Sequence, residues 1–180
     1  MSETAAGIKQ QSDFSKGSVS ANILSLALPL TVAQLINVLY NVVDRIYIGH
    51  IPGASSAALT GVGVTFPIIM AISAFAALVS MGGAPRTSIM LGKGRRDEAE
   101  KILGNCTTAL IAVSLVLTAV IQIFGQRILL TFGASGDTIE YAWSYMQIYS
   151  IGTIFVQLAL GLNAFINAQG YARTGMLTVL

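Results

Sequence analysis

The chain has 180 residues, of which 54% are hydrophobic and 10% are charged, and its formal net charge is +2. An ordinary soluble domain carries about 25% charged residues, so this composition argues strongly against a soluble protein. The small net charge, without runs of Lys and Arg interleaved with aromatic residues, excludes nucleic acid as a partner.

Four stretches of the sequence contain no Asp, Glu, Lys or Arg. They are Gly17–Val43, Ile46–Pro85, Ile102–Gln126 and Tyr141–Ala172, with 27, 40, 25 and 32 residues. Each is longer than the roughly 20 residues that cross a bilayer as a helix. A soluble helix keeps a polar face, which these stretches lack. We therefore predict an all-α integral membrane protein in contact with the lipid bilayer.

The predicted membrane helices follow the charge-free stretches. They lie near residues 20–48, 57–84, 102–126 and 138–167, with a fifth beginning near Thr174. Pro29 and Pro67 fall inside the first two helices and are expected to bend them, since neighbouring helices can satisfy the carbonyl that a proline leaves free.

Lys and Arg are divided unevenly between the two sides of the predicted membrane. One side holds only Arg45 and Arg127. The other side holds eight: Lys9, Lys16, Arg86, Lys93, Arg95, Arg96, Lys101 and Arg173. Since these residues accumulate in cytoplasmic loops, we expect a plasma (inner) membrane protein with a cytoplasmic N-terminus. Residues 1–19 would be a polar cytoplasmic tail, and residues 20–180 the transmembrane part.

A polar stripe follows one side of the first predicted helix. Its members are Gln34, Asn37, Asn41 and Asp44, whose offsets of 3, 7 and 10 residues fall within about 80° of arc on a helix. An ionisable side chain inside a membrane helix usually faces the protein interior or a water-filled cavity. Amides leading to a carboxylate favour a binding site for a coupling cation, either Na⁺ or H⁺. In the alternative interpretation, Asp44 is solvated among the lipid headgroups, with Arg45 reaching outward beside it.

The fourth predicted helix carries a second polar set. Gln147, Ser150 and Gln157 share one side and are candidates for lining the same cavity, although interhelical hydrogen bonding is the role that isolated Gln and Ser side chains favour. Asn163 and Asn167 are placed to brace a turn. The aromatic residues at the start of this helix are typical of a membrane interface; they are Tyr141, Trp143, Tyr145 and Tyr149.

Residues for enzyme chemistry are missing from the sequence. The chain has one histidine, His50, and one cysteine, Cys106, so no metal cluster and no Ser/His/Asp set is expected. We expect neither an enzyme nor a bound cofactor.

Several segments resemble the multidrug and toxic compound extrusion (MATE) family of secondary transporters. In the first helix they are Ala27-Leu28-Pro29, Gln34, Tyr40-Asn41 and Asp44-Arg45-Ile46-Tyr47-Ile48-Gly49. Further segments are Ala57-Ala58-Leu59-Thr60-Gly61-Val62, Phe66-Pro67, Leu91 to Ala99, and Asn163 to Gly170. The order and the spacing of these segments both match the pattern of the family.

This resemblance implies the N-lobe part of a fold of twelve helices in two six-helix lobes, of which the chain supplies about a third. It also implies export of organic cations or drugs against inward H⁺ or Na⁺. Asp44 would be the coupling carboxylate, and Tyr40 a further candidate for lining the cavity. Family members place an Asn and an Asp in the fifth helix, beyond Leu180, so the remaining helices are expected partners and no transport is expected from these residues alone.

Two other functions are compatible with the residues. A related flippase for lipid-linked precursors would need arginines facing its cavity to hold phosphate, and the predicted spans have only Arg45, Arg86 and Arg127 at their ends. A non-transporting membrane subunit would not need the polar stripe.

Overall fold

The computed structural model describes residues 18–50 and 55–178. The expected cytoplasmic tail, with Lys9 and Lys16, lies outside the described residues except for its last two. Within the described ranges the chain is helical without strands, which confirms the all-α class. The helices are α1 (Val19–Gly49), α2 (Ser55–Gly92), α3 (Arg96–Thr131), α4 (Ile139–Ala168) and α5 (Ala172–Leu177).

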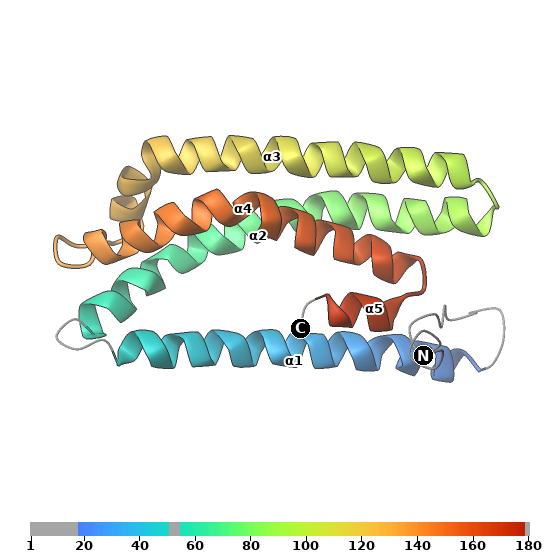
Figure 1. The fold of residues 1–180 in the computed structure, drawn as a ribbon, viewed down its shortest axis with the longest axis horizontal. Coiled ribbons are helices and arrows are strands. Elements are labelled where there is room, and N and C mark those ends of the chain that lie inside the picture. The colour runs from blue at the N-terminus through green and yellow to red at the C-terminus, as the bar shows by residue number, and fades with distance from the viewer. Residues whose placement is uncertain (1–17, 51–54, 179–180) are drawn as a thin grey trace, which may run out of the picture.

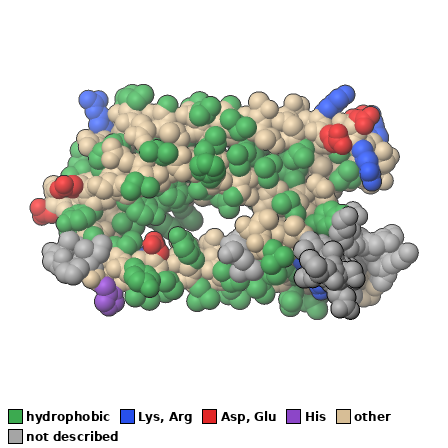
Figure 2. Space-filling model, viewed as in Figure 1, with side chains coloured by type: hydrophobic (Ala, Val, Ile, Leu, Met, Phe, Trp, Pro, Cys, Tyr) green, Lys and Arg blue, Asp and Glu red, His purple; other side chains and the backbone are tan. Residues whose placement is uncertain are grey.

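Four of these helices are long and apolar enough to cross a membrane. Figure 2 shows hydrophobic side chains spread over the length of the molecule, with most Lys, Arg, Asp and Glu side chains at its two ends. Large apolar side chains such as Leu78, Met81 and Phe155 are more than 70% exposed. A surface of this kind requires lipid, because soluble monomers expose only small apolar patches.

Helices α2, α3 and α4 form a packed bundle, and α1 lies along one side of it (Figure 1). Among the described helices, the backbone of α1 approaches only α2 and α5. Of the four membrane-spanning helices, α1 is also the least buried. Figure 2 shows an opening between α1 and the bundle. The inner side of α1 therefore faces a space that the described helices do not fill.

Apolar packing at the α1–α2 end of the bundle forms its main core cluster, which includes Ile72, Leu129 and Met146. Trp143 also packs there, against α3. A Cβ atom at Gly125 would lie 2.3 Å from the Trp143 ring, so the ring fits only because residue 125 is glycine. Trp143 thus packs against the bundle core while part of its surface stays exposed.

The turn between α2 and α3 is shorter than expected. Helix α2 passes Pro85 and continues to Gly92, and α3 starts at Arg96. Gly94 adopts a φ of 73°, a left-handed conformation that glycine adopts without strain, and this reverses the chain. Arg95 and Glu98 form an ion pair in the first turn of α3. Charged residues here belong to the ends of the two helices. The lengths of the charge-free stretches therefore underestimate the lengths of α2 and α3.

The two prolines affect their helices differently. Figure 1 shows α2, which contains Pro67, changing direction near its middle, whereas α1, which contains Pro29, runs nearly straight over most of its length. The bend expected in α2 agrees with the course of the helix, and α1 shows no comparable bend. A proline removes one backbone hydrogen bond and permits a bend, but the packing of neighbouring helices decides whether the helix takes it.

Candidate functional site

Asp44 lies on the inner side of α1. It is partly buried, although most residues of this helix are exposed. Helical spacing groups Asp44 with the buried residues Pro29 and Ala33, because offsets of 15 and 11 residues correspond to about 60° and 20° of arc. Asp44 is five residues from the end of α1, or about 7–8 Å along the axis. The carboxylate therefore faces the bundle from a position inside the helix end.

Three tyrosines on two helices accompany this carboxylate. Tyr145 in α4 lies within electrostatic range of Asp44 and Tyr40, both in α1. Tyr145 in turn stacks on Tyr149, with ring centroids 6.2 Å apart and planes 17° apart. Because α1 and α4 make no backbone contact, these side chains face each other across the space beside α1. We call Tyr40, Asp44, Tyr145 and Tyr149 the tyrosine–carboxylate group.

The amides of the polar stripe are exposed and largely satisfy one another. Asn41 donates to the backbone oxygen of Asn37 at 2.8 Å and to its side-chain oxygen at 3.2 Å. Gln34, deeper in α1, is exposed and makes no hydrogen bond to a described residue. The amides thus lie beside Asp44 on the same helix, but nothing in the described structure joins them to the carboxylate.

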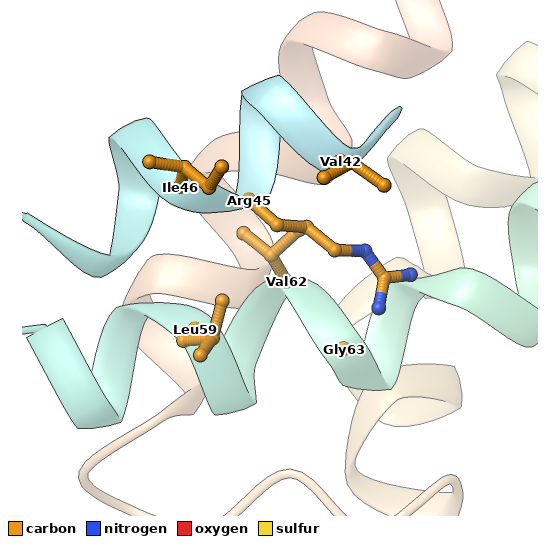
Figure 3. A pocket seen from close by; sticks show the side chains of 6 residues that line it. All are labelled: Val42, Arg45, Ile46, Leu59, Val62 and Gly63. Atoms are coloured by element: carbon orange, nitrogen blue, oxygen red, sulfur yellow. The ribbon is translucent and has the colours of Figure 1, made fainter. Parts of the chain in front are cut away.

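Arg45 takes a different direction from Asp44. Its guanidinium lies 5.5 Å from the centroid of the Phe66 ring in α2, within the range of a cation–π contact. Arg45 also lines a pocket of about 340 Å³ between α1 and α2 (Figure 3). The alternative interpretation, in which Arg45 reaches outward from the helix end, disagrees with this course, because the side chain follows α2.

The polar residues of α4 differ in their surroundings. Ser150 and Gln157 are fully buried between helices. Gln157 donates to the backbone oxygen of Ile72 in α2 at 2.8 Å, and the Ser150 hydroxyl accepts from Gln122 in α3 at 2.9 Å. These two residues therefore join helices within the bundle, which is the alternative role that their positions allowed. Gln147 is exposed.

Asn163 and Asn167 tie the end of α4 to α5. Asn163 donates to the backbone oxygen of Gly175 at 2.7 Å and to the Thr178 hydroxyl at 2.8 Å, and its own side-chain oxygen accepts from Asn167 at 2.8 Å. The expected bracing of a turn is confirmed. A Cβ at Gly175 would lie 2.3 Å from the Asn167 side-chain oxygen, so a side chain at this position would displace the Asn167 amide.

Tyr145, Tyr149 and Phe66 are the site residues that sequence reasoning missed. The two tyrosines were assigned to a membrane interface because of their place near a helix end, and their spacing of four residues was the available sign that they share one side of α4. Phe66 carried no such sign, because its contact with Arg45 joins two helices. In the part of the chain that the structure describes, no group of His, Cys, Asp and Glu could hold a metal ion.

A family model described as MatE matches residues 29–180. The chain belongs to the MatE family. This confirms the resemblance found in the sequence, and the four apolar helices make this MatE chain a multi-pass membrane protein.

Two similar MatE relatives are staphylococcal proteins named "Multidrug export protein MepA". The one from Staphylococcus haemolyticus (strain JCSC1435) is 25% identical over 167 residues, covering 93% of this chain and 36% of that protein. The one from Staphylococcus aureus (strain NCTC 8325 / PS 47) is 23% identical over 167 residues, covering 93% and 37%. The chain therefore spans little more than a third of the length of these relatives.

A solved structure named "protein A" is similar to the MatE chain in fold. It superposes with a TM-score of 0.83 at 32% sequence identity, covering 95% of this chain and 38% of that one. The arrangement of α1 beside the α2–α4 bundle thus recurs within a longer chain.

Proposed function

We propose that this chain is the N-terminal part of a secondary active exporter, in which efflux of organic cations or drugs is coupled to inward movement of H⁺ or Na⁺. Membership of the MatE family and the names of the staphylococcal relatives support the class of transport. The proposal includes a plasma-membrane location with a cytoplasmic N-terminus, supported by the excess of Lys and Arg on that side.

The placement of Asp44 carries this proposal. It is the one acidic residue of α1 and is partly buried on a helix whose other sides are exposed. Tyr145 of α4 lies within electrostatic range of it, although the backbones of α1 and α4 make no contact. A carboxylate in a low-dielectric surrounding attracts a cation more strongly than one in bulk water. Asp44 is therefore the coupling residue that we propose.

The tyrosine–carboxylate group has the chemistry for two kinds of cation. The carboxylate and phenol oxygens are hard donors that suit Na⁺ or a proton. The stacked faces of Tyr145 and Tyr149 attract organic cations through their quadrupoles. Competition of the two cations for one carboxylate would couple entry of one to exit of the other. This requires that Asp44 be exposed alternately to the two sides of the membrane.

The loose packing of α1 fits such an exchange. Helix α1 is held by α2 and α5, whereas α2, α3 and α4 pack closely with one another. A shift of α1 would thus change the surroundings of Asp44 without disrupting the bundle. The remaining two thirds of the relatives' length would supply the rest of this lobe and the opposing lobe, so we expect transport only from the complete transporter.

Replacing Asp44 by Asn in the complete transporter tests the proposal. The carboxamide has nearly the same shape but carries no charge, so ion-driven efflux of ethidium from proteoliposomes should fall to the level of empty liposomes. Asp137→Asn is the matched control, because Asp137 is an exposed residue of the loop between α3 and α4, outside the group. Undiminished efflux by the Asp44 variant would reject the proposal.

A further inference from the structure

Asp44 and Arg45 carry opposite charges at adjacent positions, yet their side chains diverge. Consecutive side chains on a helix point about 100° apart. Asp44 faces Tyr145 of α4, whereas Arg45 crosses to α2 and places its guanidinium over Phe66. No carboxylate among the described residues forms an ion pair with Arg45. The ring of Phe66 is thus the partner that the structure gives this cation.

The pocket between α1 and α2 explains why Arg45 takes this course. Figure 3 shows its side chain extending past Val62 and over Gly63, toward the Val42 side of α1 and away from Ile46. The other lining side chains are apolar, so they offer the guanidinium no competing acceptor, and Arg45 itself stays exposed. Nothing lies within 4 Å of the position that a Cβ at Gly63 would take, so the Arg45 side chain has room to pass over this residue.

This direction is opposite to the usual one for a basic residue near the end of a membrane helix. Such a residue normally extends to the headgroups. Helical side chains lean toward the N-terminus of their own helix, and for α1 that direction leads away from the nearby end. Phe66 lies where the leaning side chain can reach it, and therefore offers the guanidinium a binding surface without a negative charge.

We propose that Phe66 holds Arg45 away from Asp44 and so keeps the carboxylate available to an external cation. This inference rests on the proposed function of Asp44 as a cation-binding residue. A guanidinium released from the ring samples positions nearer to Asp44, and its positive charge competes with the ligand. Arg45 and Phe66 are positioning residues in this scheme, because neither needs to touch the bound cation.

Equilibrium binding of tetraphenylphosphonium to the complete transporter in lipid nanodiscs tests this scheme. The probe has a permanent charge, so its own protonation does not vary. Phe66→Leu keeps an apolar side chain but removes the aromatic face, and we expect it to weaken binding by about twofold to fivefold, the range that an exposed cation–π contact can supply. Phe66→Tyr keeps the face and should bind like the unaltered protein.

The double variant separates the role of Arg45 from a direct role of the ring. Arg45→Gln removes the competing charge, so Phe66→Leu with Arg45→Gln should bind as tightly as Arg45→Gln alone. If the double variant binds as weakly as Phe66→Leu, the ring contacts the ligand and the inference is overturned. Unchanged binding by Phe66→Leu overturns it as well. A thermal melt of each variant identifies losses that arise from unfolding.

Asp44→Asn distinguishes this inference from the proposed function. If that variant loses binding while Phe66→Leu does not, Asp44 binds the cation and only the role of Phe66 is rejected. If Asp44→Asn binds like the unaltered protein, the proposed function fails, and the inference fails with it.

Discussion

The side-chain amide of Gln157 donates a hydrogen bond of 2.8 Å to the backbone oxygen of Ile72, joining α4 to α2 inside the bundle. Gln157 is fully buried, and its side-chain oxygen has no partner among the described residues. One side chain therefore combines a stabilising contact with an unsatisfied acceptor. These opposing effects lead to a prediction about stability.

Gln157→Leu should change the free energy of unfolding by less than about 1 kcal/mol, because it removes an interhelical hydrogen bond worth roughly 0.6 kcal/mol together with the unsatisfied oxygen. Gln157→Ala should cost about 2 kcal/mol or more, because it also leaves a cavity. Unfolding in mixed micelles by titration with SDS measures both values. Equal losses in the two variants would show that the hydrogen bond, rather than packing, dominates.

Gly61→Ala should destabilise the bundle by about 1–3 kcal/mol, since overpacking displaces backbone. A Cβ at this position would lie 2.8 Å from the backbone oxygen of Thr138 and 3.1 Å from the backbone nitrogen of Ala142. Gly82→Ala is the control on the same helix, because nothing lies within 4 Å of its Cβ position. That variant should be neutral or gain about 0.5–1 kcal/mol from lower backbone entropy. A lower melting temperature for Gly82→Ala than for Gly61→Ala would contradict the packing argument.

Asn163→Ala should loosen α5 while leaving the rest of the bundle intact. The substitution removes both hydrogen bonds from Asn163 to the α5 segment and the acceptor for Asn167. We expect hydrogen–deuterium exchange of residues 172–177 to become about tenfold faster, equivalent to about 1.4 kcal/mol of lost protection. Asn105→Ala is the control, since Asn105 is exposed on α3. Unchanged exchange in α5 after the Asn163 substitution would mean that other contacts hold this helix.

Tyr145→Phe should weaken the binding of the coupling cation without unfolding the protein. The change removes the Tyr145 hydroxyl, which lies within electrostatic range of Asp44, but keeps the ring that stacks on Tyr149. A loss of about 0.6 kcal/mol, typical of one polar interaction in a membrane bundle, corresponds to about a threefold rise in the half-saturating ion concentration for efflux. Tyr171→Phe, in the connection between α4 and α5, should leave that concentration unchanged. Equal ion dependence of the two variants would remove Tyr145 from the site.

The linear sequence was informative about Asp44 and much less so about the residues around it. A carboxylate in a charge-free stretch is conspicuous because its transfer into lipid is costly. Its partner Tyr145 lies about a hundred positions further along, and aromatic residues near helix ends are common at membrane interfaces. Only the packing of α4 beside the space next to α1 showed which tyrosines face the carboxylate.

The course of the Arg45 side chain likewise could not be predicted from the sequence alone. Its place beside Asp44 near a helix end left open an alternative in which the side chain reaches for the headgroups. The structure turns it toward Phe66, because the lean of side chains in α1 and the open space at Gly63 favour that course. A contact of this kind depends on how two helices are aligned with each other. Residue spacing along one helix gives no information about that alignment.

The sequence by itself determined the membrane class, the number of spanning helices and the carboxylate in the first of them, because lipid imposes length and charge rules that act on each helix separately. The tertiary structure decided what each polar side chain faces. Ser150 and Gln157 are buried inside the bundle, whereas Asp44 is partly buried and faces the space beside α1. Burial and pairing depend on which helices pack together, and that choice is made by side-chain shape across helices far apart in the chain.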